Sequence, residues 1–267
     1  MVTLTRLFVA AIALSASSAA STLQPNNATL TQRAPDQALC GVDRLSVGLP
    51  RADEALLASN AQAAAAGQIQ VIWRVIHKDN TYQGGYLSQD QIHAAINELN
   101  RHYASSGFSF VLAGGSYVKN PNWFDNVDLT NNGESQASVE MKTSLHTGTA
   151  QHLNIYSTGL NTSGFLGYAR FPWWYAGNPK LDGVVFKWTT TPNGAQAGFN
   201  TGKILVHEVG HWLGLLHTFE GGCAGEGDGV LDTPAEASPA SGCPINRDTC
   251  PGFGADPIHN HMNIVYY

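Results

Sequence analysis

Residues 207–217 read His-Glu-Val-Gly-His-Trp-Leu-Gly-Leu-Leu-His, and this stretch determines how the rest of the chain is interpreted. Side chains four residues apart are neighbours on one face of a helix, so His207 and His211 can reach the same metal ion. Glu208, one residue after the first histidine, can then stand beside a water molecule on that metal. The spacing therefore predicts a helix that carries most of a catalytic metal site.

The turn after this helix is predicted to complete the ligand set. Gly214 tolerates the positive φ that ends a helix, and the turn can bring His217 back as a third nitrogen ligand. Three neutral imidazoles leave one coordination position open, as in catalytic zinc sites, whereas structural zinc sites usually fill all four positions. The alternative is a core helix with hydrogen-bonded histidines, which fits a lone His-Glu-x-x-His better than it fits the longer pattern.

The longer pattern, His-Glu-x-x-His-x-x-Gly-x-x-His, is that of the metzincin clan of zinc endopeptidases, and residues 256–262 resemble the methionine turn of that clan. Trp212 and the segments 227–234 and 242–244 distinguish one family within this clan. Together they resemble the pappalysin family, and within it the secreted metalloproteases of fungi. The resemblance covers the chain from about residue 40 to residue 262.

This resemblance implies an α+β fold with a mixed twisted sheet, a backing helix, an active-site helix and an irregular C-terminal subdomain. It also implies a zinc endopeptidase with one Zn²⁺ per chain, held by His207, His211 and His217. Glu208 would be the general base for the water that attacks the peptide bond.

Met262 of the methionine turn would form a hydrophobic base beneath the metal without ligating it. His259 and His261 flank this turn and are interpreted as turn residues. Members of the family usually read Met-Asp-Tyr here, where the tyrosine can support the tetrahedral intermediate, and then continue into a C-terminal helix. In this chain Asn263 and Ile264 follow the methionine, and the two C-terminal tyrosines are out of register, so neither is assigned that role.

The short C-terminus motivates a second hypothesis, a truncated and catalytically impaired zinc-binding homologue that binds peptides or a partner without cleavage. A lost C-terminal helix could leave the domain marginally stable. The complete histidine set and Glu208 favour the enzyme. A zinc hydrolase of small molecules is a third hypothesis, and an extended edge strand suits a polypeptide substrate better.

The composition is that of a globular chain, with 43% hydrophobic and 13% charged residues among 267. This length allows one catalytic domain with removable segments. The formal net charge of −6 argues against a basic patch, so neither nucleic acid nor a membrane surface is expected as a partner. We expect a monomer that acts on polypeptide substrates.

Residues 1–20 are predicted to be a signal peptide, because Arg6 precedes an apolar run at 7–14 and small residues follow. A membrane anchor is the alternative, but this run is well short of the ~20 residues that span a bilayer. The mature protein is therefore expected to be secreted and extracellular. Asn27 and Asn161 then become candidate glycosylation sites.

Residues 21–67 are rich in Ala, Ser, Asn and Gln, with a candidate short helix at 52–66, and are predicted to be a pro-segment. Cys40 lies within this segment, and a cysteine thiolate is a good ligand for the open position of a zinc site. The family resemblance supports a cysteine switch, in which the thiolate keeps a secreted zymogen inactive until the segment is cut. The alternative is that Cys40 forms a disulfide or remains a spectator thiol.

The catalytic domain is predicted to span residues 68–267, beginning with an apolar, β-branched central strand at 69–76. Ser88 and Gln91 form a capping box for a helix against the sheet. Its apolar stripe is interpreted as core and comprises Ile92, Ala95, Ile96, Leu99 and Tyr103. Further strands are expected at 108–112, 153–156 and 183–186. Such alternation implies a mixed sheet covered by helices.

Residues 164–172 are expected to contain an edge strand, since Pro172 argues for an edge and the glycines allow close backbone approach. An edge strand beside the zinc can bind an extended peptide by strand addition. In metzincins the strand bordering the cleft does this, and Gly167, Tyr168 and Ala169 match the family there. The alternative is an ordinary edge strand with a bulge.

The segment after His217 is irregular and rich in Gly, Pro and Asp. Asp228 and Asp232 could supply oxygen ligands to Ca²⁺, a hypothesis to which the family resemblance adds support. The default interpretation is that both are solvated turn carboxylates.

Four cysteines are present, and the sequence alone allows three complete pairings of Cys40, Cys223, Cys243 and Cys250. In pappalysins two bridges cross this region, the first cysteine pairing with the third and the second with a cysteine beyond the methionine turn. Carried over, this implies a Cys223–Cys250 disulfide. It leaves Cys243 without its partner, because the chain stops at Tyr267.

Overall fold

The computed structural model describes residues 40, 67–224, 227–242 and 244–263. The expected signal peptide, the expected helix at 52–66, Asn27 and Cys243 lie outside these residues. None of the described helices is both long and apolar enough to cross a membrane.

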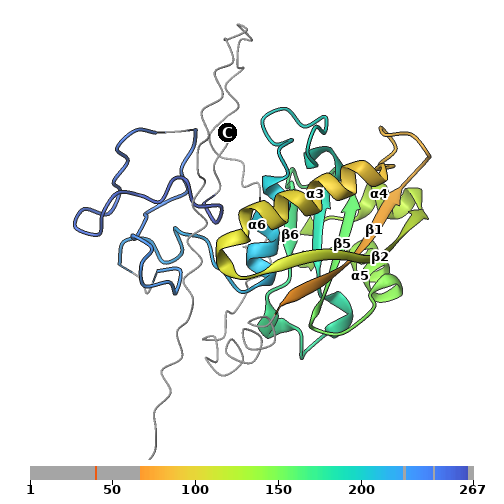
Figure 1. Cartoon of the computed structure of the whole chain (residues 1–267), viewed down its shortest axis with the longest axis horizontal. Coiled ribbons are helices and arrows are strands. Elements are labelled where there is room, and N and C mark those ends of the chain that lie inside the picture. Colours follow the sequence, from red (N-terminus) through yellow and green to blue (C-terminus); the bar gives the residue numbers. More distant parts are fainter. Residues whose placement is uncertain (1–39, 41–66, 225–226, 243, 264–267) are drawn as a thin grey trace, which may run out of the picture.

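A five-stranded sheet forms the centre of the fold (Figure 1). Its strands are β1 (Gln68–His77), β2 (Ser109–Lys119), β5 (His152–Thr158), β6 (Gly167–Ala169) and β7 (Val184–Lys187). Their order across the sheet is β2-β1-β5-β7-β6. The strands β2, β1, β5 and β7 are parallel to one another, whereas β6 is antiparallel to β7 and lies at one edge. The sheet is therefore mixed, with an edge strand within the predicted segment.

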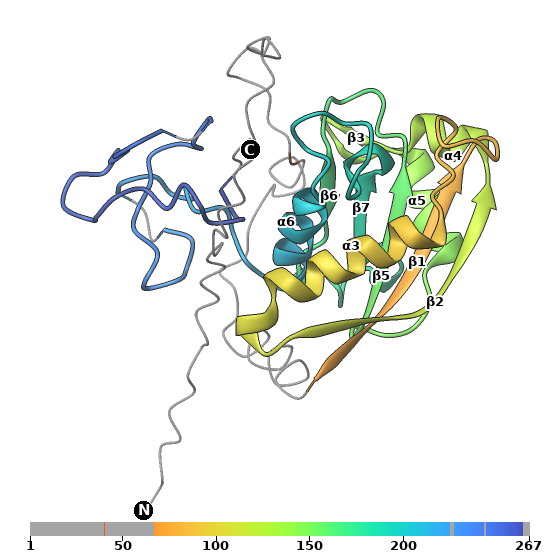
Figure 2. The ribbon, with the colours of Figure 1, turned by 45° about the horizontal axis from the view of Figure 1, so that its top comes forward.

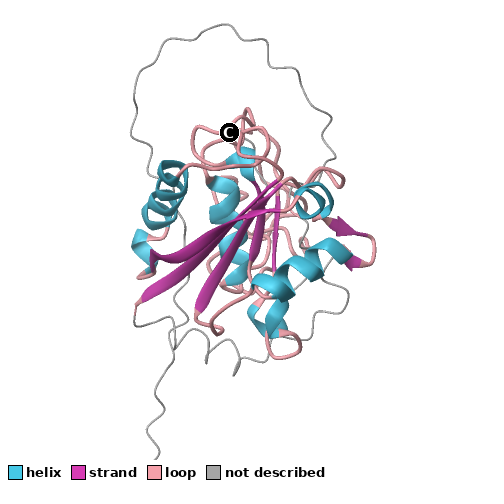
Figure 3. Ribbon diagram, turned by 90° about the vertical axis from the view of Figure 1, so that its right-hand side faces the viewer, coloured by secondary structure: helices cyan, strands magenta, loops and turns pink. Residues whose placement is uncertain are grey.

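Helices cover both faces of this sheet, as Figure 2 and Figure 3 show. On one face pack α3 (Gln89–His102) and α6 (Lys203–Trp212), and on the other α4 (Pro121–Asn126) and α5 (Gln136–Leu145). Neighbouring residues of β7 point to opposite faces, as strand geometry requires: Phe186 joins the α3/α6 core and Val185 the α4/α5 core. This two-layered burial fixes α6 against β6 and β7.

Short elements connect these layers. A two-stranded hairpin is formed by β3 (Leu129–Thr130) and β4 (Gly133–Glu134). Single turns of 3₁₀ helix are η1 (Ala104–Ser106), η2 (Pro172–Trp174), η3 (Pro179–Leu181) and η4 (Trp188–Thr190).

The helix predicted from the capping box is α3. The Ser88 hydroxyl accepts from the Gln91 N–H, and the Gln91 side chain accepts from the Ser88 N–H. The predicted stripe is buried throughout, from Ile92 to Tyr103. This helix and the central strand β1 are confirmed.

The predicted strand at 108–112 is too short, because β2 continues to Lys119. Its pairing with β1 skips Ala113, so that Leu112 faces Val71 and Gly114 faces Ile72. Hydrogen bonds to the backbone of β1 hold the rest of this strand in place. The sequence pattern did not reveal this part, because its small residues do not alternate between apolar and polar.

The C-terminal region from residue 213 to 263 contains no helix or strand among its described residues. A Cys223–Cys250 disulfide joins two of its turns, with the two Cα atoms 5.3 Å apart. The Arg247 guanidinium bonds both Glu236 and Asp256, whose carboxylates are buried. Cross-links therefore replace regular structure in this subdomain, and the disulfide is the one that the family resemblance implied.

Candidate metal centre

Three histidine side chains converge at the end of α6. His207 and His211 lie one turn apart on this helix, and His217 follows in the loop. The Nε2 atom of His211 lies 3.0 Å from Nε2 of His207 and 3.1 Å from Nε2 of His217. All three side chains are buried. The structure thus brings together the three residues that the spacing selected.

The turn at Gly214 places the third histidine. Gly214 has a φ of 101°, a left-handed conformation that favours glycine, and its N–H donates to the His211 carbonyl. The Leu215 N–H then donates to the Gly210 carbonyl. These bonds reverse the chain so that the side chain of His217 returns to those of His207 and His211.

The second nitrogen of two rings is bonded to backbone. His207 Nδ1 lies 2.6 Å from the His261 carbonyl oxygen, and His211 Nδ1 lies 2.8 Å from that of Leu215. A carbonyl only accepts, so both Nδ1 atoms carry hydrogen and both Nε2 atoms present lone pairs. The pKa of His211 lies well below its usual value, mainly because the ring is buried and to a lesser extent because the charges of His217 and His207 would repel its own. This ring is therefore neutral at pH 7.

This donor set fits Zn²⁺. The Nε2 atoms of His207 and His211 both present lone pairs and lie 3.0 Å apart, and lone pairs at that distance repel unless a cation stands between them. The buried Nε2 atom of His217 lies 3.1 Å from that of His211. Neutral imidazole nitrogens with carbonyl-bonded Nδ1 atoms are the ligands that zinc takes in catalytic sites. The residues present therefore suit the metal that the sequence predicted.

Glu208 lies between the histidines and the edge strand. Its side chain is buried, and a Cβ built on Gly167 would lie 2.6 Å from both its Cγ and its Oε1 atoms. A side chain at position 167 would thus occupy the space of the carboxylate. The absence of one lets α6 and β6 approach closely enough to hold Glu208 at the metal centre.

The Cys40 thiol lies at the same centre. Its Sγ atom lies 3.6 Å from Oε2 of Glu208, and the ligand atoms of Cys40 and the three histidines all lie within 4.8 Å of one another. The backbone at Cys40 forms a parallel bridge with Gly167 of β6. The thiol that the sequence analysis singled out therefore faces the fourth side of the histidine cluster.

Met262 packs directly beneath α6. A Cβ on Gly210 would overlap the Met262 sulfur, and the Met262 carbonyl accepts from the Thr218 N–H at 3.3 Å. The hydrophobic base beneath the metal, which the resemblance implied for Met262, stays a prediction that this packing supports.

The two histidines of the methionine turn are not ligands in this structure. His259 is exposed, whereas His261 is buried and offers its carbonyl to His207. The Nε2 atom of His261 lies 2.8 Å from Nδ1 of His102 at the end of α3. Burial lowers the pKa of both rings, that of His261 to about 3. Sequence reasoning missed this pair, since no local pattern links positions so far apart.

The remaining candidates stay predictions. The Asp228 carboxylate accepts from the Val230 N–H, and Asp232 is exposed. Among the described residues, neither belongs to a cluster of three or more metal-ligating side chains. Asn161 is exposed, and its amide donates to Asp125.

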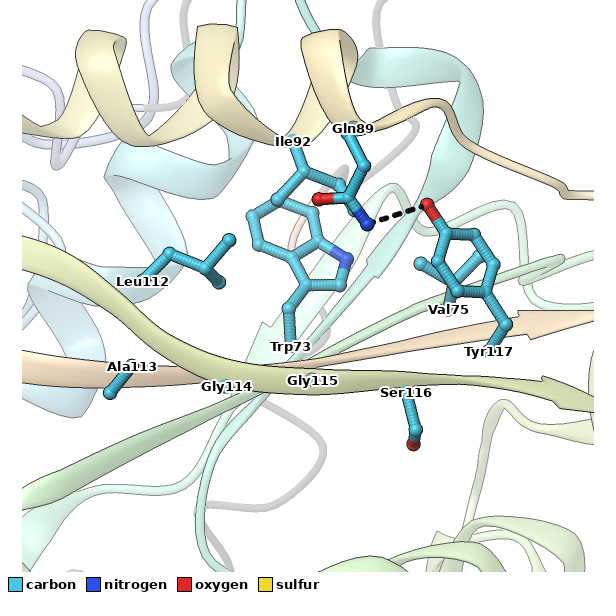
Figure 4. A pocket seen from close by; sticks show the side chains of 10 residues that line it. All are labelled: Trp73, Val75, Gln89, Ile92, Leu112, Ala113, Gly114, Gly115, Ser116 and Tyr117. Carbon is cyan, nitrogen blue, oxygen red and sulfur yellow. Dashed lines mark hydrogen bonds between the residues drawn. The ribbon is translucent and has the colours of Figure 1, made fainter.

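A separate cavity of about 210 Å³ lies between α3 and β2 (Figure 4). Trp73 and Leu112 line it, and at its polar end the Gln89 amide donates to the Tyr117 hydroxyl at 3.2 Å. None of the residues around it belongs to the histidine cluster, and we assign it no role.

Comparison with known proteins supports the interpretation of this centre. The peptidase family M43 model, described as pregnancy-associated plasma protein-A, matches residues 141–267. An extracellular metalloprotease of Verticillium alfalfae is 41% identical over 258 residues, covering 92% of this chain and 88% of that protein. One of Pyricularia oryzae is 40% identical over 235 residues, covering 84% of this chain and 80% of that protein.

Two solved structures are similar as well. Mature mirolysin of Tannerella forsythia in complex with a cleaved peptide is 25% identical, with a TM-score of 0.59 over 74% of this chain and 84% of that one. Mirolysin in complex with a molecule termed compound 9 gives a TM-score of 0.61 at the same identity and coverage.

Proposed function

Because the chain belongs to the pappalysin family of extracellular metalloproteases, peptidase family M43, we propose that it cleaves internal peptide bonds of proteins with one zinc ion held by His207, His211 and His217. The observation that carries this proposal is the convergence of three buried Nε2 atoms beside the Glu208 carboxylate and the edge strand β6.

Glu208 is the proposed general base and acid. Zinc bound by the histidines would polarise the scissile carbonyl and lower the pKa of a water molecule to about 7. Oε2 of Glu208, the oxygen that faces Cys40 Sγ, would accept a proton from the attacking water and pass it to the leaving nitrogen. Packing against Gly167 holds the carboxylate in place for both transfers.

The substrate is proposed to pair with β6. This strand lies at the edge of the sheet beside α6, and its only strand partner among the described residues is β7. Its remaining backbone groups can take an extended peptide by strand addition, which suits a polypeptide of varied sequence. Tyr168 is buried in the core behind the strand, so its side chain supports β6. The backbone groups of Leu166 and Arg170 bond the chain at β7, so by the alternation of an antiparallel ladder those of Gly167 and Ala169 point to the open edge, where the peptide would pair.

Residues 21–67 are proposed to be an inhibitory pro-segment that follows a signal peptide at 1–20 and precedes the catalytic domain at 68–267. The support is the position of Cys40, whose thiol faces the histidines while its backbone pairs with Gly167. Both the open side of the metal centre and the edge strand are then covered by one residue. Proteolytic removal of the segment would free the two together.

The proposal is tested on the protein after proteolytic activation, with a peptide substrate blocked at both ends so that only internal cleavage is measured. A zinc chelator such as 1,10-phenanthroline should abolish cleavage, and one equivalent of Zn²⁺ should restore it. Cleavage that persists without zinc, or zinc-loaded activated protein that leaves every blocked peptide intact, would contradict the proposal.

A further inference from the structure

A pair of buried histidines lies next to the metal centre and has no part in the mechanism above. His102 ends α3, and its Nδ1 atom lies 2.8 Å from Nε2 of His261. The two rings stand nearly perpendicular, with their centroids 4.3 Å apart. Because both side chains are buried, removing one partner would leave the other without the water that could replace it.

The neighbours of His102 fix the direction of this hydrogen bond. Nη2 of Arg101 lies 2.6 Å from Nε2 of His102, and a guanidinium only donates. Oε2 of Glu98, which only accepts, lies farther from the same nitrogen, at 3.4 Å. The shorter contact with Arg101 makes Nε2 of His102 an acceptor, so the hydrogen of the neutral ring is on Nδ1 and is donated to His261. Arg101 is in turn held by Glu98, one turn earlier on α3.

The end of α3 thereby contacts both elements that meet at His207. On one side the Tyr103 hydroxyl donates to the Val206 carbonyl in α6 at 3.0 Å. On the other, His102 bonds the side chain of His261, whose carbonyl accepts from Nδ1 of His207 at 2.6 Å. The orientation of a metal-ligating histidine depends on the partner of its second nitrogen. A displaced His261 would therefore tilt the His207 ring.

We propose that His102 is a positioning residue of the metal centre, which acts through its hydrogen bond to His261 and so fixes the carbonyl that orients His207. This inference rests on the proposed function, in which His207 is a zinc ligand. His102 itself touches neither the metal centre nor the peptide edge, and its effect passes through one side chain and one backbone carbonyl.

Two substitutions of His102 separate its two contacts. Asparagine carries an amide N–H near the former Nδ1 position, so His102→Asn keeps the donor to His261 and loses the contact with Arg101. Glutamine carries its amide near the former Nε2 position, so His102→Gln keeps the contact with Arg101 and loses the bond to His261. Loss of an outer partner of a metal ligand weakens metal binding ~10- to 100-fold. We expect about tenfold weaker zinc binding in His102→Gln and a change below about threefold in His102→Asn.

The measurement is the zinc dissociation constant of the full-length chain, obtained by competition with a chromophoric chelator. The visible absorption of the Co²⁺-substituted protein is recorded in parallel, because these bands report ligand geometry. They should shift in His102→Gln and match wild type in His102→Asn. Wild-type affinity and bands in His102→Gln, or equal weakening in both variants, would overturn the inference.

A second pair protects the test against variants that fail to fold. His261→Gln keeps an acceptor near the Nε2 position, whereas His261→Asn does not, so only the latter should weaken zinc binding. Thermal unfolding of the metal-free proteins reports any purely structural effect. Because none of these measurements uses a substrate, a chain that binds zinc but does not cleave peptides would contradict the proposed function and leave this inference intact.

Discussion

Replacement of Gly167 by alanine is expected to remove most of the activity while preserving the fold. The added Cβ would lie 2.6 Å from Cγ and Oε1 of Glu208, and ordinary van der Waals contact begins near 3.4 Å. The carboxylate must therefore retreat by roughly 0.8 Å. A misplacement of about 1 Å can cost ~100-fold in rate, or about 2.7 kcal/mol of transition-state stabilisation. We expect kcat/KM to fall by about 100-fold.

Stability should hardly change in this variant. The obstructing atoms all belong to one side chain, that of Glu208, and none to the backbone, and the φ of Gly167 is not in the positive range that alanine avoids. Gly114→Ala is the matched control, because this glycine also lies in a strand without a positive φ and a Cβ there meets no atom within 4 Å. The control should keep wild-type activity.

The assay compares kcat/KM of the two activated variants on an internally quenched peptide, together with zinc content and thermal unfolding of the same preparations. Equal activity of Gly167→Ala and Gly114→Ala would refute the placement of Glu208 against β6. Loss of zinc or of folded protein in Gly167→Ala would refute the argument that its effect is confined to the carboxylate.

Three further outcomes are expected. The full-length Cys40→Ala protein should cleave peptides faster than the full-length wild type at equal zinc content, and equal rates would rule out a cysteine switch. Burial raises the pKa of Asp182 from 3.8 to about 6, so its contribution to stability is complete below pH 4 and is lost as the pH rises through 6. The Trp212 indole N–H donates to Asp182 at 3.1 Å, and Asp182→Asn keeps an acceptor for this bond. In this variant the melting temperature should change less between pH 4 and pH 7 than in the wild type. An unaltered pH slope in that variant would show that another group is responsible. A calcium chelator that spares zinc should lower the melting temperature of the wild type but not of the Asp228→Asn/Asp232→Asn double variant, and no shift in the wild type would exclude calcium.

The metal ligands could be predicted from sequence because their geometry is local. His207 and His211 share a helix face by periodicity alone, and a glycine with positive φ at Gly214 explains the return of His217. The capping box at Ser88 is equally local, since it depends on two side chains three residues apart. Such features are set by the backbone geometry of one segment.

What the sequence could not predict depends on contacts between distant segments. The need for glycine at position 167 follows from the approach of Glu208, and the burial of His261 follows from its bond to His102. Helix α5 was not predicted because its apolar residues follow no clear helical stripe, although Met141 is fully buried beneath the sheet. In each case a side chain has its role only after the sheet has brought two elements together.

The central claim is that three histidines hold a zinc ion for which Glu208 provides the general base. Its most direct test is casein hydrolysis and zinc content measured on the same activated samples of the wild type and of Glu208→Gln, which keeps the size of the side chain and removes its charge. We predict one zinc per chain in both proteins, with hydrolysis only in the wild type. Hydrolysis by Glu208→Gln at the wild-type rate, or an inactive wild type with stoichiometric zinc, would contradict the account.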